Sequence, residues 1–239
     1  MEKIRISICI PTYDANDTGA LMLEESFMKI KEQSFKDFNI IVSDNSESTY
    51  SDIRLVCNKW NCKLPIRYYN HIGRKDSPSE NTNNAISKCT GELIKILCGD
   101  DLLYDNNSLQ IISDNFDDNT NWLFTSYVHS KNKIEYYRYY TPYMNDNIFI
   151  VNTLGTPSAL TIRNKNDIID IKNLFDRNLN YCYDCDGYWR LYNVYGNPKI
   201  ITDIGMINYV HENSITSHMT EEMIKKEENY ILKKYEFIK

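Results

Sequence analysis

The chain has 239 residues, of which 42% are hydrophobic and 25% are charged, and its formal net charge is -6. This composition is ordinary for a globular protein, and the acidic balance argues against a general nucleic-acid-binding protein. No apolar segment approaches the ~18 residues of a transmembrane helix, and Pro11 ends the first apolar run too early for a secretory signal. We therefore expect one domain over residues 1–239, with reduced cysteines and a cytoplasmic location.

Strands and helices are predicted to alternate along the first half of the chain. The predicted strands cover residues 4–10, 38–43, 66–69 and 94–97, and the predicted helices cover residues 21–33, 52–60 and 80–88. Period-2 alternation marks the first strand, and apolar residues at helical spacing mark the first helix. Such alternation predicts a parallel sheet with helices on both faces.

Polar residues follow three of these strands at the point where each one ends. Thr12 and Asp14 follow the first strand, Asp44 follows the second, and Asp100 and Asp101 follow the fourth. Ligands of open parallel sheets bind outside the carboxyl ends of the strands, so we expect these side chains to share one site. Adjacent carboxylates suit Mg²⁺ or Mn²⁺, although an Asp-Asp pair also occurs in simple turns and helix caps.

Two glycine-rich phosphate-binding motifs, GxxxxGK[ST] and GxGxxG, are absent from the sequence. A nucleotide bound at this sheet would therefore need a metal ion, rather than a glycine loop, to neutralise its phosphates.

The second half of the chain is less regular. We predict strands at residues 122–128, 159–162, 200–201 and 207–210, and helices at residues 184–195 and 221–239. The tyrosine-rich residues 134–143 fit either an edge strand or a loop over a ligand. The last helix is amphipathic and charged, so packing on the domain is the favoured interpretation and contact with a membrane surface is the alternative.

These motifs together resemble the family-2 glycosyltransferases of the GT-A fold, over nearly the whole chain to about Ser217. The similar segments are residues 7–13, 33–46, 84–86, 90–97, 100–101, 155–158, 183–191 and 209–217. The chain departs from the family pattern at two positions. Gly99 stands where many members have an acid, and Tyr183 replaces a glutamate.

The resemblance implies an α/β fold with a mostly parallel sheet, helices on both faces and a smaller mixed acceptor-side region. It implies a nucleotide-sugar-binding half at residues 1–104, an acceptor and catalytic half at 105–219, and a C-terminal helix at 220–239. The implied reaction moves a sugar from a nucleoside diphosphate sugar, with a UDP-sugar favoured, to a glycan or another hydroxyl acceptor. The anomeric carbon is inverted, and Mn²⁺ or Mg²⁺ is the implied cofactor.

Residue roles also follow from the resemblance. Asp101 and His211 are the implied metal ligands, and Asp184 is the implied general base. The implied nucleotide contacts are Pro11, Thr12, Tyr13, Asp14, Asp44, Asn84, Asp100 and Arg190. Asp184 also fits an ordinary helix N-cap, and Arg190 also fits a structural ion pair.

Other functions stay open at this point. A nucleotidyltransferase shares a nucleotide-binding sheet and acidic metal ligands, but it normally has a glycine-rich basic loop after the first strand, which residues 11–15 lack. A non-catalytic protein that binds a sugar or a nucleotide is a third interpretation. Cys182 and Cys185 form a CxxC pair that fits a redox motif or half of a zinc site, but the sequence has no second such pair.

Overall fold

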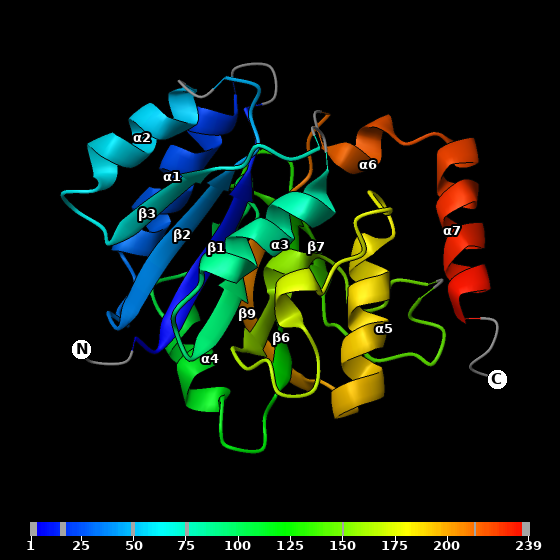
Figure 1. Cartoon of the computed structure of the whole chain (residues 1–239). Coiled ribbons are helices and arrows are strands. Elements are labelled where there is room, and N and C mark those ends of the chain that lie inside the picture. Colours follow the sequence, from blue (N-terminus) through cyan, green and yellow to red (C-terminus); the bar gives the residue numbers. More distant parts are fainter. Residues whose placement is uncertain are drawn as a thin grey trace.

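The computed structural model describes residues 4–14, 18–48, 51–74, 77–149, 151–212 and 214–235. The elements follow in the order β1 (Ile6–Thr12), α1 (Gly19–Lys31), β2 (Phe38–Asp44), α2 (Asp52–Trp60), β3 (Ile66–Asn70), α3 (Pro78–Lys88), β4 (Leu93–Ile96), β5 (Leu102–Leu103), α4 (Ser108–Asn115), β6 (Trp122–Ser130), β7 (Tyr136–Tyr140), η2 (Pro157–Ala159), β8 (Leu160–Arg163), η3 (Ile171–Asn173), α5 (Tyr183–Tyr195), β9 (Lys199–Tyr209), α6 (Ile215–His218) and α7 (Glu221–Tyr235). Figure 1 shows one central sheet with helices on both of its faces.

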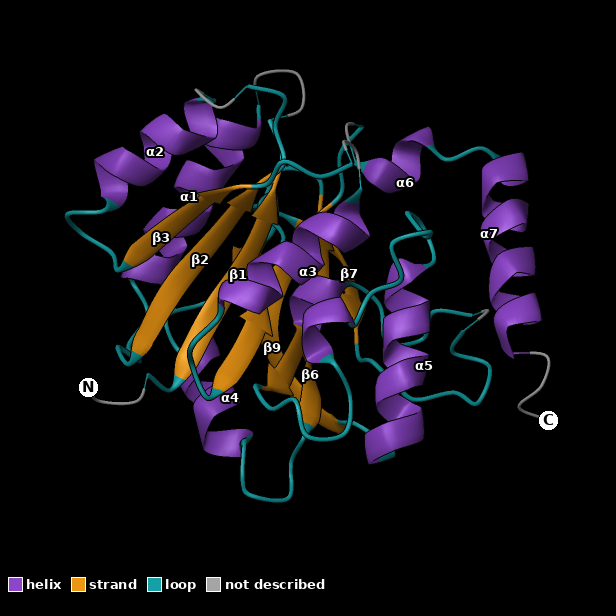
Figure 2. Cartoon of the chain, in the orientation of Figure 1, coloured by secondary structure: helices purple, strands orange, loops and turns teal. Residues whose placement is uncertain are grey.

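One nine-stranded sheet connects the two halves of the chain, in the order β3-β2-β1-β4-β8-β6-β9-β5, with β7 paired to β6. The strands β3, β2, β1 and β4 are parallel to their neighbours. From β8 onwards the pairing is mixed, because only β6 and β9 run parallel there. The expected α/β fold, with a parallel first part and a mixed second part, is confirmed (Figure 2).

Alternating side chains of the strands supply two hydrophobic cores, one on each face of the sheet. In β1, Ile6, Ile8 and Ile10 join the core that is shared with α1, α2 and α4. Cys9 points the other way and joins the core that includes residues of α3 and α5. This arrangement explains why nearly all of β1 and β2 is buried, as expected of parallel strands covered on both faces.

The structure corrects one prediction in the second half. Two short strands were expected at residues 200–201 and 207–210, but β9 is continuous over Lys199–Tyr209. The pairing with β6 shifts register on either side of Ser126, and Thr202 and Asp203 are exposed there. These exposed polar residues interrupt the apolar pattern without ending the strand. The strand β5, the helices α4 and α6, and the short 3-10 helices η2 and η3 were not predicted.

The C-terminal helix α7 packs beside α5, on the side away from the sheet (Figure 1). Its Ile231 is fully buried against Leu179 and Cys182, which lie just before α5. The prediction that this helix packs on the domain is therefore confirmed for the side that carries Ile231. None of the helices in the described parts of the chain combines the length and the apolar character needed to span a membrane.

Candidate active site

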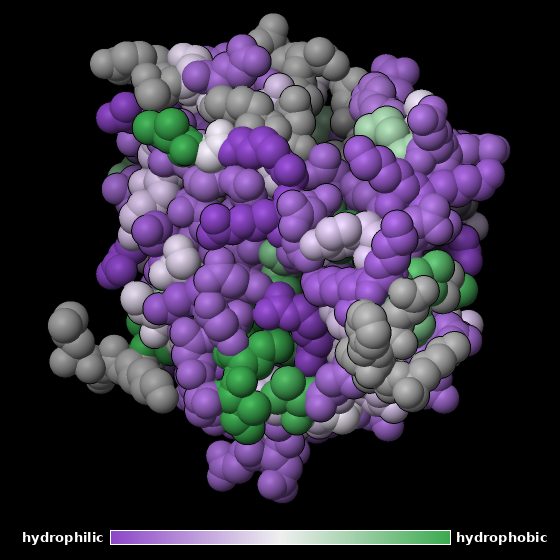
Figure 3. Space-filling view, turned by 45° about the vertical axis from the view of Figure 1, so that its right-hand side comes forward, coloured by the Kyte–Doolittle hydropathy of each residue, from purple (hydrophilic) through white to green (hydrophobic). Residues whose placement is uncertain are grey.

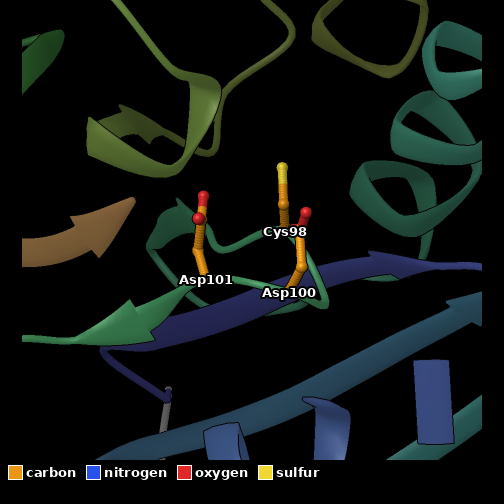
Figure 4. Close-up of side chains that lie close together, drawn as sticks. All are labelled: Cys98, Asp100 and Asp101. Atoms are coloured by element: carbon orange, nitrogen blue, oxygen red, sulfur yellow. The ribbon is translucent and has the colours of Figure 1, made fainter. Parts of the chain in front are cut away.

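An acidic cluster lies in the turn that follows β4. The Sγ of Cys98 and the carboxylate oxygens of Asp100 and Asp101 are all within 4.8 Å of one another. Figure 4 shows that the three side chains point to the same side of this turn. These groups are the donor types that divalent ions accept, with hard oxygens from the two aspartates and a softer sulfur from the cysteine.

Asp101 is held at this position by β9. Its Oδ1 accepts hydrogen bonds from the backbone N–H of Tyr209, at 2.9 Å, and from Nδ2 of Asn208, at 3.2 Å. The side chain is buried, and burial followed by the charge of Asp100 raises the pKa of its carboxyl, against the hydrogen bonds that lower it. A cation beside this pair would relieve the repulsion that raises the pKa, so the residues present fit a divalent metal.

His211 lies against Asp100 rather than Asp101. The distance between Nε2 of His211 and Oδ2 of Asp100 is 2.9 Å. The imidazole also stacks on the ring of Tyr209, with ring centroids 4.8 Å apart. Two of the sequence-predicted site residues, Asp100 and His211, are thus in direct contact, while Asp101 is fixed by the neighbouring strand.

The strand that leads into this turn contains a buried lysine. Lys95 is in β4, is fully buried, and donates a hydrogen bond from Nζ to the backbone carbonyl of Ser158. Burial lowers the pKa of Lys95 to about 7, and the nearby Asp101 and Cys98 oppose this shift. Ser158 also accepts the backbone N–H of Cys98 on its hydroxyl, at 2.9 Å. This serine therefore connects the turn after β4 to the segment 155–158, one of the segments that resemble the family.

The contact between Gly99 and β1 explains the first departure from the family pattern. A Cβ atom on Gly99 would lie 2.6 Å from Oγ1 of Thr12 and 2.9 Å from its Cβ. No side chain fits there while Thr12 keeps its place. The third group of the cluster comes instead from Cys98, which the sequence analysis did not identify. The sequence pattern that could have indicated Cys98 is its position two residues before Asp100, separated from it only by Gly99.

Asp44 ends β2, but its carboxylate is enclosed. The Oδ1 atom accepts from the backbone N–H and the hydroxyl of Ser46, at 2.9 and 2.5 Å. The Oδ2 atom accepts from the hydroxyl of Tyr68, at 2.8 Å, and from that of Ser51. Asp44 has no exposed surface, so in this structure its oxygens hold the β2 end together. The contact with a nucleotide stays a prediction.

The other predicted nucleotide contacts of the first half lie along the ends of β1 and β2. Pro11 and Thr12 are the last two residues of β1, and the Thr12 carbonyl accepts from Nδ2 of Asn81 at 2.9 Å. The backbone N–H of Asp14 donates to the hydroxyl of Ser46.

Tyr13 and Asn84 complete this group of predicted contacts. Tyr13 is exposed at 38% and is therefore accessible to a ligand. Asn84, in α3, donates from Nδ2 to the hydroxyl of Ser43, at 2.7 Å. Their roles stay predictions, as do those of their neighbours in β1.

Asp184 is the second residue of α5 and is not its N-cap, which is Cys182. Its Oδ2 accepts from Nδ2 of Asn152 at 2.8 Å, and its Oδ1 accepts from the N–H of Cys185 at 2.7 Å. Burial raises the pKa of the Asp184 carboxyl to about 6. A carboxylate with this pKa is ionised at neutral pH and accepts a proton more readily than an ordinary aspartate.

Tyr183 connects Asp184 with the acidic cluster. Burial raises the pKa of its phenol well above the usual value, and the negative charges of Cys98, Asp184 and Asp100 raise it further. The tyrosine that replaces a family glutamate is therefore influenced by the charges of both the cluster and the candidate base.

Asp186 and Arg190, on the same helix, have other partners. Oδ1 of Asp186 accepts from Nζ of Lys234 and from the hydroxyl of Tyr235, both at 2.7 Å. Nη1 of Arg190 donates to the backbone carbonyls of Asn173, at 2.6 Å, and of Leu174. Both side chains thus hold neighbouring segments, and the predicted nucleotide contact of Arg190 stays a prediction.

The CxxC pair has the environment of buried structural thiols. Cys182 and Cys185 are both buried and free, and burial raises the pKa of each thiol. Reactive and metal-binding cysteines need a lowered pKa, so this pair does not support a redox or zinc site.

Comparison with known proteins identifies the family. Residues 7–192 match the sequence family Glycosyl transferase family 2. The chain belongs to this family. It is 31% identical over 99 residues to the GalNAc(5)-diNAcBac-PP-undecaprenol beta-1,3-glucosyltransferase of Campylobacter jejuni, a match that covers 41% of this chain and 30% of that protein. Family membership and this relative support glycosyltransferase function.

Two solved structures share the fold of this family-2 chain. S. aureus TarS 1-349, in complex with UDP-GlcNAc, superposes with a TM-score of 0.69 at 16% identity, over 98% of this chain and 73% of that one. The mannosyltransferase PcManGT from Pyrobaculum calidifontis, in complex with GDP-Man and Mn²⁺, gives a TM-score of 0.62 at 15% identity, over 89% of this chain and 59% of that one. At these low sequence identities, the structural similarity shows a shared fold.

Proposed function

We propose that the chain transfers a sugar from a nucleoside diphosphate sugar to an acceptor hydroxyl, with inversion and with a divalent metal ion. The observation that carries this proposal is the acidic cluster of Cys98, Asp100 and Asp101, together with the buried carboxylate of Asp184. Asp100 and Asp101 repel one another within the cluster, and Asp184 has no cationic hydrogen-bond partner among the described residues.

The cluster would hold the ion through Asp100 and Asp101, with His211 as the neighbouring donor. Burial raises the pKa of the Cys98 thiol well above its usual value, as it does for Cys182 and Cys185, so Cys98 lines the site as a neutral thiol. A bound Mn²⁺ or Mg²⁺ supplies positive charge that stabilises the diphosphate leaving group. Asp101 is fixed by β9 and would be the more rigid ligand, while Asp100, which lies against His211, would be the second.

Asp184 would take the proton of the acceptor hydroxyl. Its hydrogen bonds to Asn152 and to the N–H of Cys185 fix the orientation of the carboxylate. A base on the side of the sugar opposite the leaving group gives inversion, because the acceptor oxygen then attacks from that side. Asp186 is unsuited to this role, since Lys234 and Tyr235 already occupy its Oδ1.

The donor that we propose is a UDP-sugar, and the acceptor is a glycan. The TarS structure contains UDP-GlcNAc, and the name of the Campylobacter jejuni relative describes a glycan on a lipid diphosphate. An acceptor of that kind would bring the protein to a membrane surface from the cytoplasm.

The test measures the melting temperature with UDP-sugars and GDP-mannose, each with Mn²⁺, with Mg²⁺ or with a chelator. A ligand that binds the folded state raises this temperature by mass action. We expect a UDP-sugar to do so only with a metal present, and the same donor to release UDP when a glycan acceptor is added. Binding without any transfer or hydrolysis would favour the non-catalytic alternative, and release of pyrophosphate from a nucleoside triphosphate would favour a nucleotidyltransferase.

A further inference from the structure

The helix α7 lies outside residues 7–192, the part of the chain that matches the family, yet it contacts the segment that leads into α5. Its outer side is strongly polar, with exposed Glu221, Glu222, Lys225 and Lys226. Figure 3, in which this side of the molecule is turned forward, shows a mainly hydrophilic surface with small separate hydrophobic areas. The inner side of α7 therefore holds the more informative contacts.

Glu227 binds three successive backbone amides in front of α5. Its Oε1 accepts from the N–H of Asn180 at 2.9 Å, and its Oε2 accepts from those of Tyr181 and Cys182 at 2.8 and 2.9 Å. Cys182 is the N-cap of α5, and Asp184 is only two residues further on. Hydrogen bonds to an ionised acceptor are stronger than those between neutral groups, and a carboxylate near a helix N-terminus is also favoured by the helix dipole.

The same segment is held from its other side by the first half of the chain. Nη2 of Arg74, in the loop after β3, donates to the carbonyl of Arg177 at 2.5 Å and to Oδ1 of Asn180 at 3.0 Å. Residues 177–182 are thus fixed between Arg74 and Glu227. The hydrogen bonds of Asn152 and Cys185 orient the Asp184 carboxylate, but the position of its backbone depends on this segment.

A second contact of α7 distinguishes the two acids of α5. Lys234 lies 2.7 Å from Oδ1 of Asp186 and 2.7 Å from Oδ2 of Asp176. Asp186 is thereby neutralised by a cation, whereas both hydrogen-bond partners of Asp184 are uncharged. The helix therefore leaves one acid of α5 available for proton transfer and ties the other to the C-terminal region.

We propose that Glu227 is a positioning residue for Asp184, and that α7 sets the geometry of the candidate base through the segment 177–182. This proposal rests on the proposed role of Asp184 as the general base. It concerns the transfer step and not the binding of the donor, since the predicted donor contacts lie mostly at the ends of β1, β2 and β4, away from α7.

The test compares Glu227→Gln with Glu222→Gln, an exposed glutamate on the same helix that serves as the matched control. We expect Glu227→Gln to lower kcat by about 10-fold to 10²-fold, because small displacements of a catalytic group cost that much. The affinity for the donor should stay at the parental value. Amide hydrogen exchange in residues 180–182 should become faster in this variant only.

Arg74→Gln loosens the same segment from its exposed side and tests the proposal if Glu227→Gln does not fold. It should lower kcat in the same direction with unchanged donor affinity. The proposal is overturned if amide exchange accelerates in either variant while kcat per folded molecule does not change. Asp184→Asn distinguishes failure of the positioning role from failure of the base role. If Asp184→Asn keeps its turnover, Asp184 is not the general base. If Asp184→Asn loses its turnover while Glu227→Gln keeps a normal kcat, only the positioning role of Glu227 is rejected.

Discussion

The ends of β2 and β4 lie on either side of β1 in one sheet, and both carry aspartates in very different surroundings. At the β2 end, Asp44 accepts four hydrogen bonds from neutral donors and has no exposed surface. At the β4 end, Asp100 and Asp101 repel one another, although His211 lies against the first and β9 donates two hydrogen bonds to the second. The β2 end is complete without a ligand, whereas the β4 end carries a charge that a cation would neutralise.

This difference teaches that position at the carboxyl edge of a sheet is not enough to define a ligand contact. An acid whose oxygens are all satisfied stabilises its own surroundings, and displacing its partners costs free energy. An acid beside another acid has a reason to bind a cation. Each of the following experiments tests one side of this comparison.

The largest effect is expected for Asp184→Asn. The amide keeps the size of the side chain but cannot take a proton, so turnover should fall by roughly 10²–10⁴-fold. Donor affinity, measured by isothermal titration calorimetry, should stay near the parental value. The contrasting variant is Asp186→Asn, which should lower the melting temperature and leave the turnover of folded protein nearly unchanged.

Asp44→Ala should mainly unfold the β2 end. It leaves the hydroxyls of the buried Ser51 and the half-buried Tyr68 without their acceptor, so the free energy of unfolding should fall by about 2–4 kcal/mol. Denaturant titration measures this, with the exposed Asp37→Ala as control. If the variant keeps its stability but loses donor affinity, Asp44 is a nucleotide contact and the comparison between the two strand ends is wrong.

Asp101→Asn should weaken the binding of Mn²⁺ in the presence of UDP by at least about 10-fold, because one ligand charge is lost next to the ion. Electron paramagnetic resonance of free Mn²⁺ reports this binding without any need for turnover. The exposed Asp118→Asn should bind like the parent. Equal affinity in both variants would mean that the acidic cluster is only a turn.

The smallest effect is a pH dependence. Burial raises the pKa of Asp184 to about 6, and a base acts only when it is ionised, so kcat should fall by about 10-fold per pH unit below that value. An aspartate with the ordinary pKa near ~3.9 would keep kcat constant down to about pH 5. The residual turnover of Asp184→Asn should show no step at pH 6, and a step retained in that variant would assign the titration to another group.

Much of the fold followed from local pattern. The period-2 strands, the helical spacing and the acids at strand ends depend on neighbouring residues, and these predicted the parallel sheet and the turn after β4. The continuity of β9 did not follow, because Thr202 and Asp203 are exposed at a register shift against β6. The sequence also could not distinguish Asp44 from Asp100, since the difference depends on hydroxyls that approach from β3 and α2.

Other contacts in the site also could not be predicted from the local sequence. Cys98 lies beside the two acids in the turn after β4, and Glu227 contacts the residues before α5 because α7 folds back beside that helix. Contacts between residues far apart in the sequence leave no local pattern. The pairing of His211 with Asp100 is a third example, since either of the two adjacent acids fitted the sequence equally well.

The close approach of Gly99 to Thr12 has an evolutionary consequence. A descendant of this protein gains an acid at position 99 only if the residue at position 12 becomes smaller in the same lineage. Each change alone is unfavourable, since the first creates a clash and the second leaves a gap at the end of β1. The two positions should therefore vary together.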